Sequence, residues 1–232
     1  MSGPPPFAFP VATLGFLRDL RANNTKPWFD AHRADYETAY VAPAKAFVET
    51  IAPALGDLVP GLAAEPRVNG SIFRINRDVR FSADKTPYKD HLDFWFWSGD
   101  RRGALSGLFL RIAPDAITVG AGAHGFDRAQ LAAYRVAVAD PTAGAALTEI
   151  VQAVERSGHA VGGETYARLP RGLSADGERA RLLRHSSLHA TTELDAAVAL
   201  DPALPGVLLP HWTAMAPLHT WLTEHVAAPA GQ

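Results

Sequence analysis

The residues best suited to chemistry lie in one stretch, SIFRINRDVRFSADKTPYKDH, which runs from Ser71 to His91. Five cations and three anions stand close together here, whereas the whole chain has a formal net charge of -2. The stretch therefore predicts a local cationic site with internal counter-charges, which suits a small anion, either a carboxylate or a phosphate. The cations are Arg74, Arg77, Arg80, Lys85 and Lys89, and the anions are Asp78, Asp84 and Asp90.

Three arginines of this stretch, Arg74, Arg77 and Arg80, are expected to clamp the ligand. A planar guanidinium group can bond a carboxylate or a phosphate through two parallel hydrogen bonds. Asp78 and Asp84 are expected to hold some of the cations in place. The donors that remain would then face the ligand.

Proton transfer is assigned to Lys85 and Tyr88, with Asp84 as the third member of the candidate catalytic set. Lys85 and Tyr88 are three residues apart and could share a small site. A lysine beside a tyrosine can lower the pKa of the phenol and allow it to transfer a proton. The sequence leaves open whether the protein is an enzyme.

Two other interpretations of the same charges stay open. In one, the Arg–Asp pairs only lock a loop at the edge of a sheet, as in a structural clasp, and Tyr88 only packs. In the other, the segment is a non-catalytic module that binds an acidic partner or a nucleic acid. A net charge of -2 and a pI of about 6.5 disfavour nucleic acid, which needs a broad basic face.

A resemblance to a known family bears on the choice between these interpretations. From Arg74 to Tyr88 the chain reads R-x-x-R-D-x-R-F-x-x-D-K-x-x-Y, which resembles the signature R-x-x-R-D-x-R-F-x-x-[DN]-K-x-x-Y of a bacterial domain-of-unknown-function family of about 230 residues. FLRDLRANNTKPWFDAHRADY is similar to the family's N-terminal segment, and RLPRGLSADGERARLLRHSSL is similar, more loosely, to its C-terminal segment. The resemblance implies no known activity, but it favours a site over a clasp.

Two residues of the N-terminal segment, Asn24 and Trp28, join the ligand-binding candidates. Asn24 could donate a hydrogen bond to a substrate, and Trp28 could form a wall of the pocket. The alternatives are a helix C-cap for Asn24 and burial against the sheet for Trp28.

The elements that would position these residues come as helices, then strands, then helices, which predicts an α+β fold. We expect one domain with a central, mostly antiparallel sheet flanked by N-terminal and C-terminal helices. Thr25 and Pro27 are a capping residue and a first-turn proline at the start of one helix. The expected helices cover 12–24, 25–40, 44–55, 127–140, 141–158, 178–185 and 211–226. The expected strands cover 91–97, 104–112, 116–123 and 186–194, and 159–178 is expected to be rich in loops.

The charged stretch itself reads slightly better as a strand than as a helix between Phe73 and Phe81. Its alternation would place Ile75, Arg77 and Val79 on one face with the two phenylalanines, so that this apolar face carries one arginine in its middle. The other face would carry Arg74, Asn76, Asp78 and Arg80. We therefore expect the apolar residues to anchor the segment on the sheet. A single turn, TPYKDH, would follow and present Tyr88.

Composition limits the remaining classes. The 232 residues suit one domain, predicted over 10–228, after a flexible Pro-rich arm at 1–9. The chain has no cysteine, no basic apolar leader and no run long enough to span a membrane, so we expect a soluble cytoplasmic protein without a membrane partner. The sequence does not indicate the oligomeric state.

No cofactor or metal is expected. GAGAHG, from Gly120 to Gly125, is a literal G-x-G-x-x-G, but the strand before it reads as part of an antiparallel hairpin, which argues against a dinucleotide site. His91 and Asp93 share one strand face, yet the nine histidines show no H-E-x-x-H pattern. The absence of cysteine also removes thiolate metal sites.

Overall fold

The computed structural model describes residues 3–169, 172–173, 175 and 177–226. The chain divides into two compact units, each built from several segments. The first unit contains Met1–Phe96, Phe109–Thr118 and Glu193–Leu209, and the second contains Trp97–Leu108, Val119–Thr192 and Pro210–Gln232. The predicted extent of a single domain, 10–228, stays a prediction.

The strands of the described residues form a six-stranded antiparallel sheet with the order β1-β2-β3-β4-β6-β5. This sheet and its helices confirm the predicted α+β class. Strand β5 lies in the segment that was expected to be rich in loops, so that expectation is wrong for its residues. The strands are Leu62–Ala63 (β1), Leu92–Ser98 (β2), Gly107–Ile112 (β3), Ala116–Ala123 (β4), Ala160–Glu164 (β5) and His185–Asp195 (β6).

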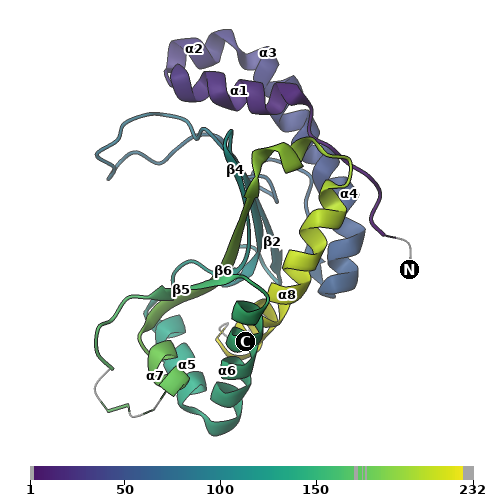
Figure 1. Cartoon of the computed structure of the whole chain (residues 1–232). Coiled ribbons are helices and arrows are strands. Elements are labelled where there is room, and N and C mark those ends of the chain that lie inside the picture. Colours follow the sequence, from purple (N-terminus) through teal and green to yellow (C-terminus); the bar gives the residue numbers. More distant parts are fainter. Residues whose placement is uncertain (1–2, 170–171, 174, 176, 227–232) are drawn as a thin grey trace. The chain divides into compact units, whose positions relative to one another are not determined.

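The N-terminal helices of the first unit follow local signals in the sequence. The Thr25 side chain accepts a hydrogen bond from the backbone N–H of Trp28, which confirms the predicted N-cap, and Pro27 lies in the first turn. Phe16 of the first helix packs on Trp28, with 6.0 Å between ring centroids, so α1 and α2 lie side by side (Figure 1). The elements are α1 (Val11–Ala22), α2 (Lys26–Ala31), α3 (Arg33–Asp35), a π-helix (Tyr36–Val41) and α4 (Ala42–Leu58).

The end of the predicted flexible arm is anchored in the first unit. The backbone N–H of Phe7 donates to Pro202 O at 3.0 Å, and that of Phe9 donates to Ala199 O at 2.8 Å. Both rings also pack against Phe47. Phe7 and Phe9 of the predicted arm are therefore attached to the first unit, because their aromatic rings gain burial there. The flexibility of the arm as a whole stays a prediction. Residues 1–2 of the predicted arm lie outside the described residues.

The charged stretch does not form the expected strand. Between Phe73 and Phe81 its only strand-like feature among the described residues is an isolated bridge from Asn76 to Tyr88. Phe81, expected to lie on the sheet, is 95% exposed. Asp78 and Asp84 bond to groups two residues further on, and such short-range bonds favour turns over strand pairing.

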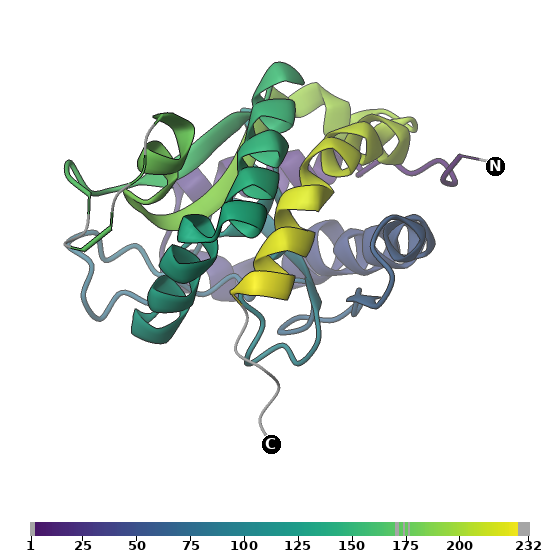
Figure 2. The ribbon, with the colours of Figure 1, turned by 90° about the horizontal axis from the view of Figure 1, so that it is seen from below.

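Helices of the second unit are α5 (Arg128–Ala139), α6 (Pro141–Arg156), α7 (Gly177–Leu182) and the part of α8 (Leu204–His225) from Pro210 onward. Asp127 and Gln130 form a capping box on α5, and Asp140 caps α6. Figure 2 shows the yellow half of α8 beside α6, where Trp221 Nε1 donates to Ala143 O at 3.0 Å. These contacts confirm that the predicted helices around 127–158 form.

The glycine-rich GAGAHG segment has a packing role. Gly122 has a φ of +119° and lies in strand β4, where an added Cβ would stand 2.3 Å from Leu188 O of β6. Only glycine fits so close an approach between two backbones. Because β4 lies in an antiparallel sheet, the segment lacks the parallel βαβ context of a dinucleotide site.

Candidate functional site

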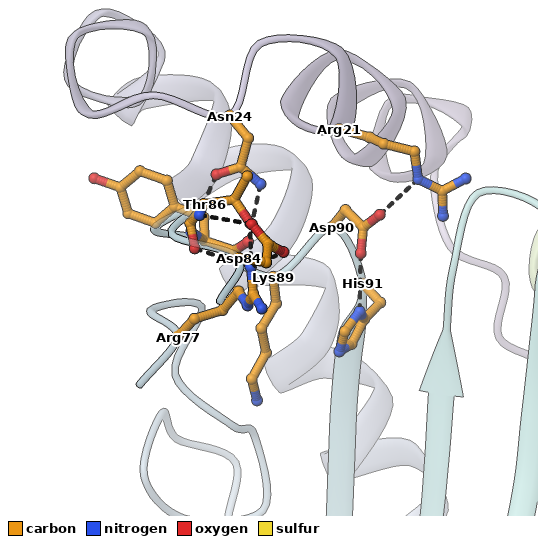
Figure 3. Close-up of a pocket in the computed structure, with 9 residues that line it drawn as sticks. Arg21, Asn24, Arg77, Asp84, Thr86, Lys89, Asp90 and His91 are labelled. Atoms are coloured by element: carbon orange, nitrogen blue, oxygen red, sulfur yellow. Dashed lines mark hydrogen bonds and ion pairs between the residues drawn. The ribbon is translucent and has the colours of Figure 1, made fainter. Parts of the chain in front are cut away.

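A pocket of about 390 Å³ lies in the first unit, beside the charged stretch (Figure 3). Three cations and two carboxylates are among its lining residues, so the pocket is polar and slightly positive. The lining residues are Arg21, Asn24, Arg77, Asp84, Thr86, Tyr88, Lys89, Asp90 and His91. Figure 3 shows Arg77, Asp84 and Thr86 meeting on one side of the pocket, and Arg21, Asp90 and His91 meeting on the other.

Asn24 attaches the charged stretch to the end of α1. Its Nδ2 donates to Tyr88 O at 2.9 Å, and its Oδ1 accepts from the Tyr88 N–H at 3.1 Å. One side-chain amide thus satisfies both backbone groups of Tyr88, as a neighbouring strand would. The Tyr88 ring stacks on Phe29 of α2 at 4.2 Å between centroids. Both contacts hold the base of the loop against the helices.

Arg77 and Asp84 form one charged centre of the pocket. Arg77 Nη1 donates to Asp84 Oδ2 at 2.5 Å, to Thr86 O at 3.1 Å and to the Thr86 hydroxyl. Hydrogen bonds from the Thr86 backbone N–H, from Arg77 and from the Thr86 hydroxyl lower the pKa of Asp84 to about 2. Asp84 is therefore ionised near neutral pH and serves as the counter-ion of Arg77.

The guanidinium group of Arg77 has hydrogen-bond donors that the described residues do not engage. All of its hydrogen bonds to the described residues come from Nη1, which leaves Nε and Nη2 without a protein partner there. Its side chain is 27% exposed and lines the pocket. Arg77 can therefore donate to a ligand without releasing Asp84.

Arg21 and Asp90 form the second charged centre. Arg21 Nε donates to Asp90 Oδ2 at 2.6 Å, and its two Nη groups donate to Asp115 at 3.2 Å. Burial acts to raise the pKa of Asp90, but hydrogen bonds from His91 and Arg21 outweigh it, so the pKa lies below its ordinary value. All three nitrogens of Arg21 are thus engaged with carboxylates, which leaves fewer donors for a ligand than on Arg77.

Asp93 lies on β2, outside the pocket lining, and has three positive or polar neighbours. Its carboxylate accepts from Arg111 Nε at 2.7 Å and from Lys89 Nζ at 3.2 Å, and His91 Nε2 lies 3.2 Å away. Burial acts to raise the pKa of Asp93, yet hydrogen bonds from His91 and Arg111 hold it well below the ordinary range. His91 Nδ1 lies 3.0 Å from Asp90 Oδ1, so the imidazole bridges both carboxylates.

Five of the predicted site residues lie outside the pocket lining. Arg80 binds Asp78 through Nε and Nη2, at 2.9 and 2.6 Å, on an exposed turn. Arg74 is exposed, and Trp28 stacks on His32 at 4.0 Å between centroids. The three predicted clamp arginines are therefore not gathered in one pocket, and Arg77 alone of them lines it.

Lys85 is the fifth of these residues. Its Nζ donates to Val79 O at 2.9 Å, within the same turn. Tyr88 does line the pocket, but its contacts are with Asn24 and Phe29. A shared Lys85–Tyr88 proton-transfer site stays a prediction.

Several pocket residues were not among the predicted site residues: Arg21, Thr86, Lys89, Asp90 and His91. One signal in the sequence indicates the charged network that holds two of them, Lys89 and His91. Asp93 alternates with aromatic residues on a strand expected to be covered on both faces, and a covered carboxylate needs cationic partners. Arg111, on the next strand, is that partner.

The described residues contain no group of three or more histidine and acidic side chains arranged to hold a metal ion. In the same part of the chain, no helix combines the length and apolarity needed to cross a bilayer. The chemistry that the pocket offers is hydrogen bonding and charge. Its donors are guanidinium, ammonium, hydroxyl and amide groups, and these suit an anion.

Comparison with known proteins assigns a family but no activity. The family model described as "Conserved hypothetical protein (DUF2461)" matches residues 12–221. This confirms the resemblance to a family of unknown function of this length, while the signature between Arg74 and Tyr88 stays a prediction. Neither the search of curated proteins nor the search of solved structures gave a match.

Proposed function

The chain belongs to the DUF2461 family of conserved hypothetical proteins, and since that description assigns no activity, we propose from the pocket that the protein binds a small anionic ligand, a carboxylate or a phosphate. One observation carries the proposal. Arg77 lines the pocket, is held in place by Asp84 and Thr86 through Nη1, and keeps Nε and Nη2 without a partner among the described residues. A guanidinium group held in this way is pre-organised for an anion.

Lys89 supplies the second cation of the proposed site. Its side chain is 20% exposed and lines the pocket. One of the three N–H groups on Nζ donates a hydrogen bond to Asp93. Asp93 thereby directs the ammonium group, and two N–H groups remain for other partners. Arg77 and Lys89 therefore keep N–H groups that Asp84 and Asp93 do not engage, and these can bind an anion.

The size of the pocket indicates a ligand larger than a bare ion. Its volume of about 390 Å³ falls in the range of roughly 300–1,000 Å³ that holds small organic ligands. We therefore propose an organic acid or an organic phosphate. Proton transfer by Lys85, Tyr88 and Asp84 has less support, because Lys85 lies outside the lining and Asp84 is ionised. The proposed location remains the cytoplasm, since a sequence without cysteine fits a reducing compartment.

Calorimetric titration with phosphate and with acetate tests the proposal. We expect Arg77→Gln and Lys89→Met each to weaken binding about tenfold, because each removes a charged hydrogen bond to the ligand. Thermal melting of each variant is recorded in parallel, so that loss of folding is separated from loss of binding.

The charged loop provides matched controls for both variants. Arg80→Gln and Lys85→Met remove the same side-chain types from residues outside the lining, and binding should be unchanged. If Lys85→Met abolishes binding or turnover while Lys89→Met does not, the site is centred on Lys85 and Tyr88 instead. If the wild-type protein binds neither these anions nor a larger organic acid or organic phosphate up to millimolar concentration, the proposal is wrong.

A further inference from the structure

The segment from Asp78 to Lys85 is bonded only to itself and to its two flanking residues. Arg80 pairs with Asp78, and both Ser82 N and Lys85 Nζ donate to Val79 O, at 3.4 and 2.9 Å. Every hydrogen bond and ion pair that these residues make with the described part of the chain ends between Arg77 and Thr86. Within the described residues, only Asp84 ties the segment to the rest of the first unit, through Arg77 and Thr86. Residues 79–83 can therefore move without breaking a hydrogen bond or ion pair to the described residues outside 78–85.

Phe81 lies in this segment with its ring in solvent, 95% exposed. The guanidinium carbon of Arg80 is 5.8 Å from the centroid of the ring. A phenyl group gains a large free energy when it is buried, so full exposure leaves Phe81 available to cover another apolar surface. Arg80 beside it adds a positive charge that suits an anionic molecule.

The pocket and the exposed ring belong to one loop. Arg77, Asp84 and Thr86 form part of the pocket wall and also mark the base of the segment that carries Phe81. The pocket volume of about 390 Å³ equals the liquid volume of roughly a dozen waters at about 30 Å³ each, which is far more than one carboxylate or phosphate needs. The remaining space would hold the body of the ligand.

We propose that the ligand carries an aromatic or similarly flat apolar group beside its anionic group, and that Phe81 packs on this group when residues 79–83 fold over the pocket. Phe81 is then a specificity-determining residue, while Arg77 and Lys89 hold the anion. The inference rests on the proposed function, because it needs an anion bound at Arg77.

Two pairs of probes test the inference by calorimetry: phosphate against phenyl phosphate, and acetate against benzoate. Within each pair the anionic group is the same and only one member carries a ring. We expect the wild-type protein to bind the aromatic member about five- to tenfold more tightly, in line with one aromatic contact. Phe81→Ala should remove this preference and leave the affinity for phosphate and acetate unchanged, and Phe81→Tyr should keep it.

Val11→Ala is the matched control, because Val11 is 70% exposed in the same unit and lies outside the pocket lining. Val11→Ala should leave the affinity for all four probes unchanged. Hydrogen exchange of the amides of residues 79–83 should slow with phenyl phosphate and stay unchanged with phosphate alone.

The outcomes distinguish the two proposals. If the small anions bind but Phe81→Ala leaves the aromatic preference intact, or if no preference exists, the inference is overturned and the proposed function stands. If Phe81 instead binds a macromolecular partner, the small anions should bind without any aromatic preference. If no probe binds, both proposals fail together.

Discussion

At the scale of single residues, each cation of the pocket has a specific carboxylate, and this pairing decides how much charge a ligand meets. Asp84 neutralises Arg77 from an exposed position, with 59% of its side chain in solvent. Asp93 neutralises Lys89 and Arg111 from a buried position, with 13% exposed. The two carboxylates therefore differ in what their loss would do: one competes with a ligand, and the other supports the fold.

Asp84→Asn should strengthen phosphate binding about fivefold. The change removes a negative charge beside the anion, and the amide oxygen can still accept from Thr86 N. Calorimetry at low and moderate salt measures it. Asp78→Asn, which touches Arg80 outside the lining, should leave binding unchanged. Unchanged or weaker binding together with a lower melting temperature would show that Arg77 and Asp84 form a clasp.

Asp93→Asn should lower the free energy of unfolding by about 2–3 kcal/mol, because it breaks a buried, charge-assisted network. This loss is smaller than the loss on breaking a fully buried ion pair, because Arg111 is 48% exposed and water can solvate it. Urea denaturation measures it. Asp78→Asn should lower the stability much less, because its pair with Arg80 is exposed to solvent. Equal effects of the two variants would contradict the structural role of Asp93.

At the scale of elements, the base of the charged loop is held by the side chain of Asn24 together with backbone hydrogen bonds across the loop. The backbone of Tyr88 is clamped by Asn24, which follows α1, and the neighbouring N–H groups of Arg77 and Lys89 bond across the loop base to Pro87 O and Ile75 O. Helix α1 thus sets where the cations of the pocket lie. This arrangement assigns to Asn24 a positioning role in addition to its place in the lining.

Asn24→Ala should destabilise the loop base by about 1–3 kcal/mol, because it leaves both backbone groups of Tyr88 without their partner. Hydrogen exchange of the Tyr88 amide should become correspondingly faster, and phosphate binding should weaken. Asn23→Ala is the matched control, since Asn23 is exposed and its side chain bonds only Asp19 O within the described residues. If both variants exchange alike at Tyr88, another contact holds the loop.

At the scale of the whole molecule, buried histidines make stability depend on pH. His219 of α8 is 1% exposed, and its two ring nitrogens lie 3.0 Å from the hydroxyl oxygens of Ser98 and Ser106. Burial lowers the pKa of His219 to about 4. The unfolded chain, with an ordinary histidine pKa near 6.5, binds a proton there more readily than the folded chain does.

Stability should therefore be fully present above pH 6.5 and fall as the pH drops from 6.5 toward 4, by about 3 kcal/mol from His219. His219→Gln should flatten part of this slope, although His185, His189 and His211 also have a lowered pKa and keep the rest. Thermal melts between pH 4 and 8 measure the slope. His225→Gln, an exposed position on the same helix, should keep the full slope. A slope that is identical in wild type and His219→Gln would contradict this assignment.

The sequence by itself determined the helices and the main strands, because their signals lie within a few residues of each other. Thr25 with Pro27 is an example, and this cap forms as predicted. Only the tertiary structure decided which of the charged side chains meet at the pocket. Arg21 meets Asp90 across 69 residues and Arg111 meets Asp93 across 18, so no local spacing indicates either pair. The same limit explains why Phe81 does not lie on the sheet and Lys85 does not line the pocket, although both were expected to. Alternation and the motif are local patterns, whereas packing decides which side chains face a pocket and which face solvent.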